Sequence, residues 1–103
     1  MIRSSFANIT LPKVLSADQP APVMIMGPQP NRVTLLFSPA SGDYVLTTAG
    51  GGKLLIAATG ERLKFTREQY GNLLDQAWYA TTVKAPSGDT DAIDLCVLVA
   101  TEV

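Results

Sequence analysis

The sequence predicts a mostly β protein: a small antiparallel β-sandwich or barrel with one short helix and an extended, proline-rich N-terminal arm. From residue 32 onward, short segments alternate apolar with polar residues, which is typical of strands that bury one face. Turn-forming residues separate these segments at intervals of about eight to twelve residues, the spacing of sandwiches and barrels. The length of 103 residues suits a single domain.

The first 30 residues differ from the rest, and we expect residues 1–30 to form the arm and residues 31–103 the sandwich. Proline cannot donate a hydrogen bond to a β ladder, and it interrupts this segment at Pro12, Pro20, Pro22, Pro28 and Pro30. Short extended pieces are expected between the prolines, at residues 6–11, 13–15 and 23–26. The segment is too apolar for a solvated tail. Two arrangements remain open: the arm closes its own sandwich, or it lies on a neighbouring subunit.

The strands of the sandwich are expected where β-branched and aromatic residues alternate with polar ones, at residues 32–38, 44–48, 53–58, 62–65, 77–84 and 93–99. In the first of them, Val33, Leu35 and Phe37 share one face. The residues from Pro39 to Asp43 have the composition of a turn, so the first two strands are expected to form a hairpin.

One helical signal interrupts the strands. Thr66, followed three residues later by Gln69, matches a capping box, in which two side chains cap the first turn of a helix. Leu73 and Leu74 then follow at helical spacing. Gly71 weakens a helix, so we expect only about two or three turns. The alternative is a loop that crosses one end of the sandwich.

The charge composition argues against nucleic acid and membranes as partners. Eight basic and nine acidic residues give a net charge of −1, and the basic residues are spread along the chain. Nucleic acid and anionic lipid require a clustered basic surface, and no apolar run approaches the roughly 20 residues of a membrane span. Only 17% of the residues are charged, below the usual level of about a quarter, which favours a surface partly covered by another protein.

The residues that carry most enzyme chemistry are scarce. The chain has no histidine, which removes the commonest general base and the usual metal ligand. Its single cysteine, Cys96, lies in an apolar run and is expected to be a small buried residue. Because no internal disulfide can form, the composition fits assembly in a reducing cytoplasm. We therefore expect neither an enzyme nor a bound cofactor or metal ion.

An aromatic platform for a glycan is the main alternative site. Tyr44, Tyr70, Trp78 and Tyr79 supply rings that could stack on a sugar. Trp78 and Tyr79 point to opposite faces of an extended segment, so one of them is expected in the core. No basic groove accompanies these rings, as a site for single-stranded nucleic acid would need.

Three motifs follow one another along residues 31–103. Asn31-Arg32 opens a strand, Gly50-Gly51-Gly52 precedes an amphipathic strand, and Trp78-Tyr79-Ala80 precedes the closing strand. In these motifs the chain resembles a group of small phage-encoded β-sandwich proteins of the capsid-decoration or head-fibre type. The motifs are structural, and the resemblance carries no active site. It implies a structural protein of the virion that is assembled in the host cytoplasm.

The function implied by this resemblance is capsid decoration, in which the protein binds and stabilises the major capsid protein or other virion subunits. Exposed sheet edges and the arm would supply main-chain hydrogen bonds to such partners. A homo-oligomer is expected, with a trimer favoured, because proteins of this kind occupy symmetry axes. The alternative is a tail, neck or fibre component with a receptor- or glycan-binding role. The contact residues are expected in the arm, at Ile2, Phe6, Ile9, Met24 and Met26.

Overall fold

The computed structural model describes residues 1–50, 53–57 and 60–103. Strands make up about half of the chain: β1 (Ile2–Leu11), β2 (Val23–Met26), β3 (Arg32–Phe37), β4 (Tyr44–Thr48), β5 (Lys53–Ala57), β6 (Leu63–Thr66), β7 (Trp78–Thr82) and β8 (Ile93–Glu102). A short helix and a 3₁₀ turn lie between β6 and β7, α1 (Arg67–Tyr70) and η1 (Gly71–Asp75).

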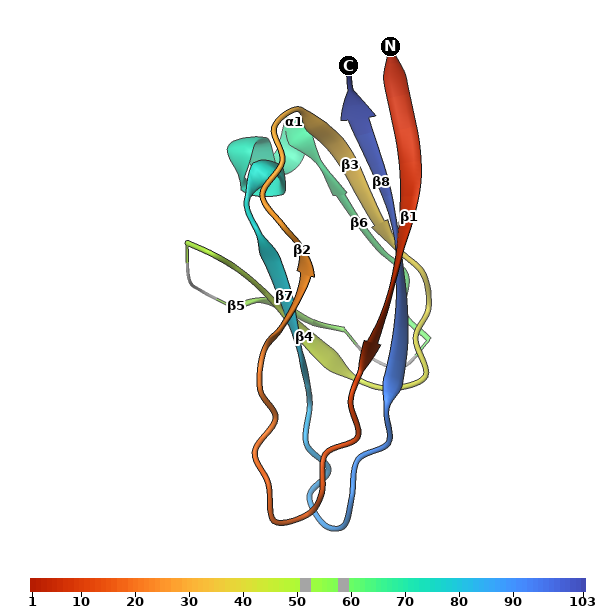
Figure 1. The fold of residues 1–103 in the computed structure, drawn as a ribbon, viewed down its shortest axis with the longest axis vertical. Coiled ribbons are helices and arrows are strands. Elements are labelled where there is room, and N and C mark those ends of the chain that lie inside the picture. Colours follow the sequence, from red (N-terminus) through yellow and green to blue (C-terminus); the bar gives the residue numbers. More distant parts are fainter. Residues whose placement is uncertain (51–52, 58–59) are drawn as a thin grey trace.

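The strands form two sheets that face one another (Figure 1). One sheet has the order β1-β8-β3-β6 and the other β2-β7-β4-β5, and neighbouring strands are antiparallel. The chain crosses between the sheets after every strand except β4, which pairs directly with β5. This is the strand order of a jelly roll, a sandwich built from two Greek keys. The predicted fold class, a small antiparallel β-sandwich with one short helix, is confirmed.

The hairpin expected between residues 32–38 and 44–48 is wrong. β3 pairs with β6 and β8, whereas β4 pairs with β5 and β7 in the opposite sheet. The turn that joins β3 to β4 therefore carries the chain from one sheet to the other. A turn composition marks a change of direction, but it does not say whether the next strand pairs with the last one or lies across the core from it.

The space between the sheets is filled by an apolar core with an aromatic centre. Trp78, Tyr44 and Phe37 are fully buried. The ring of Phe65 lies 5.8 Å from that of Phe37 and 5.1 Å from that of Trp78, both in edge-to-face geometry. The indole N–H of Trp78 donates to the carbonyl oxygen of Leu73 at 3.2 Å, which satisfies the polar atom of this buried side chain.

β3 departs from the expected face pattern at its start. Leu35 and Phe37 are buried as predicted, but Val33 is only half-buried. The pairing with β8 shifts register between Arg32 and Thr34, as a bulge does. Arg32 consequently lies on the core side and is 3% exposed. The bulge exchanges an expected apolar position for a charged one.

The first 30 residues supply β1 and β2 to the same sandwich as the rest of the chain. β1 pairs with β8 along its whole length, from Ile2 opposite Glu102 to Leu11 opposite Ile93. β2 pairs with β7 in the other sheet. The boundary expected at residue 30 coincides with no break in either sheet, so this segment closes its own sandwich.

The helical segment begins where the sequence indicates and has about the expected length, but only its first part is α-helix. Thr66 is the N-cap of α1, and its hydroxyl oxygen accepts a hydrogen bond from the backbone N–H of Gln69 at 3.4 Å. Gly71 ends the helix with φ 58° and ψ −134°, a conformation that other residues rarely adopt. The expected two or three turns are therefore divided between a short α-helix and a 3₁₀ turn. No described helix is long and apolar enough to cross a membrane.

The loops after β1 and β7 are joined to each other at one end of the sandwich (Figure 1). Val14 and Thr90 exchange two backbone hydrogen bonds of 2.9 and 2.8 Å. Asp89 accepts a hydrogen bond from the backbone N–H of Ser16 at 2.9 Å and lies 3.5 Å from the ammonium group of Lys13. These contacts fix the C-terminal end of β1 and direct the exposed part of the strand toward the opposite end of the molecule.

Candidate subunit interface

An apolar row crosses the outer face of the sheet β1-β8-β3-β6. The register places Phe6 opposite Leu98 on β8, and Leu98 opposite Leu36 on β3. Side chains of a strand alternate between the two sheet faces, and these three point away from the core. Phe6 is 69% exposed, and the two leucines are half-buried. The row ends at the exposed side chain of Lys64, opposite Leu36 on β6. We call Phe6, Leu36 and Leu98 the outer apolar row.

β1 is one of the two edge strands of this sheet, and its backbone groups alternate in direction. Met1 and Val103 exchange two backbone hydrogen bonds, with N···O distances of 3.1 and 2.7 Å. In an antiparallel pair, residues that exchange hydrogen bonds alternate with residues whose N–H and C=O point away. The backbone N–H and C=O groups of the odd-numbered residues of β1 therefore point toward β8. The outward-facing positions are the even-numbered ones, Ile2, Ser4, Phe6, Asn8 and Thr10.

A second contact supports this alternation. The backbone N–H of Glu102 donates to the carbonyl oxygen of Asn31 at 2.9 Å, on the β3 side of β8. Glu102 is the register partner of Ile2, so neither residue turns its backbone toward the other. Among the described residues, the outward N–H and C=O groups of β1 have no backbone partner. We call this row of groups the free edge of β1.

The structure separates the five predicted contact residues into three environments. Ile2, Phe6 and Met24 are 51%, 69% and 55% exposed. Ile9 is half-buried against the core, and Met26 is 7% exposed within it. Met26 is therefore not accessible to a partner in this structure. The exposed three lie on β1 and β2, the edge strands on the same side of the two sheets, but Met24 belongs to the sheet that does not carry the outer apolar row.

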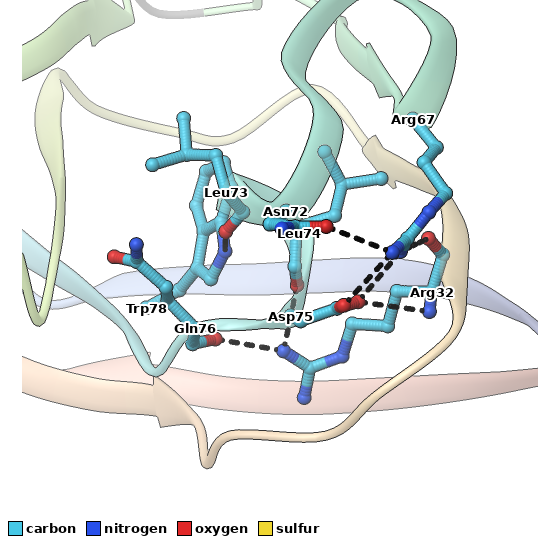
Figure 2. A network of polar contacts seen from close by, with 8 residues as sticks. All are labelled: Arg32, Arg67, Asn72, Leu73, Leu74, Asp75, Gln76 and Trp78. Atoms are coloured by element: carbon cyan, nitrogen blue, oxygen red, sulfur yellow. Dashed lines mark hydrogen bonds and ion pairs between the residues drawn. The ribbon is translucent and has the colours of Figure 1, made fainter.

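A polar network joins the start of β3 to the segment that follows α1 (Figure 2). The buried guanidinium of Arg32 donates to the carbonyl oxygens of Leu74 at 3.0 Å and Gln76 at 2.8 Å. A third bond reaches the carbonyl oxygen of Gly27 in the turn between β2 and β3. Burial lowers the pKa of Arg32, and the charge of Asp75 opposes this effect.

Asp75 is the acceptor at the centre of the network (Figure 2). Its two carboxylate oxygens accept hydrogen bonds from Arg67 at 2.9 and 3.1 Å, and one also accepts from the backbone N–H of Arg32 at 3.1 Å. The guanidinium of Arg67 donates further to the carbonyl oxygen of Arg32 at 3.0 Å and to Asn72 at 3.1 Å. The hydrogen bonds from Arg67, followed by that from Arg32, lower the pKa of Asp75.

The network has a structural role. Its hydrogen bonds connect β3 and the neighbouring Gly27 turn to the segment from Arg67 to Gln76, which lies far from both in the sequence. Sequence reasoning identified Arg32 only as the opening of a strand and did not associate it with Arg67 or Asp75. No local pattern indicates such a contact, because 43 residues separate Arg32 from Asp75.

The predicted aromatic platform is not formed. Tyr44 and Trp78 are both fully buried in the core, and Tyr79 is half-buried on the other face of β7. Tyr70 is exposed at 43% and packs edge-to-face on Phe65. The four rings therefore do not share a surface. One residue of the Trp78-Tyr79 pair was expected in the core, and that residue is Trp78.

Among the described residues, Cys96 and the acidic side chains form no cluster of metal-binding type. Cys96 was expected to be buried, but it is half-buried on the outer sheet face, opposite Asn8 of β1. Among the side chains that the structure describes, no three acidic or cysteine residues gather as metal ligands. The absence of an enzymatic role stays a prediction. What the described surface offers instead is an apolar sheet face beside an unpaired strand edge.

No family model matches the chain, and no curated protein matches it. Solved structures do share its fold. An HTH_3 family transcriptional regulator from Vibrio cholerae superposes with a TM-score of 0.57 at 14% identity, over 97% of this chain and 44% of the regulator. A cupin protein from Bacteroides fragilis superposes with a TM-score of 0.51 at 11% identity, over 97% of this chain and 66% of the cupin. The chain thus spans less than two thirds of either protein.

These likenesses define the class of fold: a jelly-roll sandwich of the kind seen in cupins. At such low identity they carry no information about activity or partners. The coat protein of Tobacco streak virus is also similar, with a TM-score of 0.37 and 10% identity over 96% of this chain and 85% of the coat protein. That overlap is too loose to support a functional argument.

Proposed function

We propose that this chain is a non-catalytic structural domain that binds other protein subunits through the outer apolar row. The observation that carries the proposal is the 69% exposure of Phe6 beside Leu98 and Leu36 on one sheet face. Burying a Phe side chain is worth about 1.5–3 kcal/mol, so a partner surface that covers Phe6 gains this free energy. Aromatic residues are enriched in interface cores, where a few side chains supply most of the binding energy.

In its particular form, the proposal is a bacteriophage virion protein that decorates the capsid and stabilises its subunits. The resemblance of residues 31–103 to phage decoration and head-fibre proteins supports this form, and so does the low share of charged residues, 17%. Jelly rolls recur in viral capsid domains, lectins and cupins, so the fold is compatible with a virion role without defining it. The partner would be the major capsid protein or another virion subunit.

The test is co-sedimentation of the purified protein with phage shells that lack it. The wild-type protein is expected to sediment with the shells. Phe6→Ser is expected to weaken binding at least about tenfold, which corresponds to about 1.4 kcal/mol. Met24→Ser is the matched control, because Met24 is a similarly exposed large apolar side chain of the other sheet. It should leave the binding unchanged.

Two outcomes would count against the proposal. If the wild-type protein bound no part of the particle, the virion role would be rejected. If both variants lost binding affinity equally, the outer apolar row would not be the contact surface. Binding to isolated tails in place of shells would indicate that the protein belongs to the tail, neck or fibre. The same protein–protein chemistry would then act at another place in the virion.

A further inference from the structure

We propose that two copies of this chain associate through the free edge of β1, with the two β1 strands antiparallel about a twofold axis at Phe6. The inference deepens the proposed function, because it names the first partner of a subunit-binding domain and the backbone groups that bind it. The pairing would join the sheets β1-β8-β3-β6 of the two copies into one continuous sheet.

β1 differs from the other edge strands in lacking most of the features that keep edges unpaired, and its single charged side chain is Arg3. Natural edges are protected by short length, lysine, proline or bulges. β2 and β6 have four residues each, and β5 has five. β2 also shifts register against β7, and β5 and β6 each contain a lysine. β1 runs for ten residues without lysine, proline or a register shift. Its length and regularity fit an edge that is paired in the assembled protein.

The direction of the backbone groups selects the register. Only even-numbered residues of β1 offer outward N–H and C=O groups, so a symmetric partner must bring even-numbered residues opposite each other. A twofold axis at Phe6 places Ile2 opposite Thr10 of the partner, and Ser4 opposite the partner's Asn8. In this register every outward-facing residue of β1 has a hydrogen-bonding counterpart. Any shift along the strand leaves outward groups at one end unpaired.

The twofold register brings no like charges of β1 together. Arg3 is the only charged residue of β1, and the twofold register places it opposite Ile9 of the second copy, so the two arginines do not meet. Ser4 meets Asn8, and the two Phe6 side chains lie together on one face. Cross-strand aromatic pairs of this kind stabilise a sheet. The net charge of −1 per chain adds little long-range repulsion.

The dimer would also enlarge the outer apolar row. In each copy the row runs from Leu36 through Leu98 to Phe6 at the sheet edge. Pairing at Phe6 joins the two rows end to end across the combined sheet. The joined face remains open, because edge pairing uses backbone groups in the plane of the sheet. A capsid surface would then meet a longer apolar row than a single copy offers.

The first test uses the oligomeric state in solution, measured by light scattering across a concentration series. The wild-type protein is expected to have the mass of a dimer. Ser4→Pro removes one outward N–H and leaves the hydrogen bonds to β8 intact, so it is expected to give a folded monomer. Ser4→Ala keeps the N–H and should remain a dimer. Thermal unfolding of each variant checks that the sandwich is preserved.

The second test reads the register by disulfide formation in a Cys96→Ser background. Paired residues in hydrogen-bonded positions have Cα atoms about 5.5 Å apart, within disulfide range. Ser4→Cys mixed with Asn8→Cys is expected to form a covalent heterodimer on oxidation. Ser4→Cys alone should not, because its two copies would lie about 14 Å apart along the strands. Asn8→Cys alone gives the same control from the other side.

A wild-type monomer at all concentrations, or a trimer, would overturn the inference. So would a Ser4→Pro dimer, or cross-linking that is equal in the mixed and single samples. Shell binding by the wild-type protein is measured separately, so a monomer that still binds shells would reject the dimer and keep the proposed function. A dimer that binds no part of the particle would support the dimer and reject the proposed function.

Discussion

Asp75 holds together groups from three elements. Its carboxylate accepts hydrogen bonds from Arg67 and from the backbone N–H of Arg32. Hydrogen bonds to a charged acceptor are stronger than neutral ones, but both side chains of this ion pair are partly exposed, at 35% and 23%. The contribution to stability is therefore modest, and it depends on the ionised form of Asp75.

Asp75→Asn is expected to lower the free energy of unfolding at pH 7 by about 1 kcal/mol. The pKa of Asp75 is lowered in the folded protein, so the stabilisation is present above the unfolded pKa and is lost as the pH falls below about 4. Urea unfolding from pH 6 to pH 2 should show a steeper loss in the wild-type protein than in the variant. The exposed Glu68→Gln is the control, and a wild-type slope in Asp75→Asn would contradict this role.

Tyr44 presents the opposite case, a buried hydroxyl group that has no hydrogen-bond partner among the described residues. Burial, reinforced by the charge of Glu61, raises the pKa of Tyr44 to about 12. The unfolded chain releases this proton near pH 10, whereas the folded protein retains it. Stability therefore falls as the pH rises from 10 to about 12, by about 2–3 kcal/mol at the upper limit.

Tyr44→Phe removes the titrating group and an unsatisfied polar atom, so its stability near pH 7 should equal or exceed that of the wild-type protein. Its advantage should then grow as the pH rises above 10. Chemical unfolding at pH 8, 10 and 11.5 measures the difference in the free energy of unfolding between the two proteins. The ionisable groups that both proteins contain affect both values equally and do not change this difference. Tyr70→Phe, at an exposed position, should show no such growth. A constant difference across this range would refute the assignment.

At the scale of elements, Gly71 decides where α1 ends. Its φ of 58° lies in the region that favours glycine, and an added Cβ would meet no atom within 4 Å. Gly71→Ala should therefore destabilise the protein through backbone strain alone, by about 1–2 kcal/mol. Gly27→Ala is a matched control, because it also meets no atom and has no positive φ. Thermal unfolding of both variants checks the prediction, and equal melting temperatures would contradict it.

The strands and the helix start could be predicted from the sequence because they depend on local patterns. Alternation located β3, β4, β7 and β8, and the Thr66 side chain caps α1 as its spacing indicates. Partners of strands could not be predicted in the same way. Ile2 pairs with Glu102 across the whole length of the chain, and β3 and β4 separate into different sheets. These choices depend on how the complete core packs, which no local window contains.

The residues of the candidate subunit interface could likewise be predicted only in part. Alternation places Leu36 and Leu98 on the faces opposite the core residues, and Phe6 was named as a contact residue because the first segment is apolar. Their alignment in one row follows only from the registers of β1 with β8 and of β8 with β3. Met26 was misplaced because the sequence shows an apolar segment but not which of its side chains the opposite sheet covers.

At the scale of the whole molecule, the two ends of the chain lie side by side at one end of an elongated sandwich of 47 × 24 × 19 Å (Figure 1). β1 and β8 run together along it and place the free edge and the outer apolar row on the same sheet. Edge and face are therefore separate contact surfaces. In the two proposals, the edge binds a second copy of this chain and the face binds a virion subunit.

This separation predicts an alternating pattern of amide hydrogen exchange in β1. Odd-numbered amides such as those of Ser5 and Ala7 face β8 and should be protected in any folded form. The even-numbered amides of Phe6 and Asn8 point outward, so they should exchange rapidly in the Ser4→Pro monomer and slowly in the wild-type dimer. Exchange measured by NMR on both proteins compares the same amides with and without a partner. If the wild-type dimer kept rapid exchange at Phe6 and Asn8, its contact would lie on a surface other than the free edge of β1.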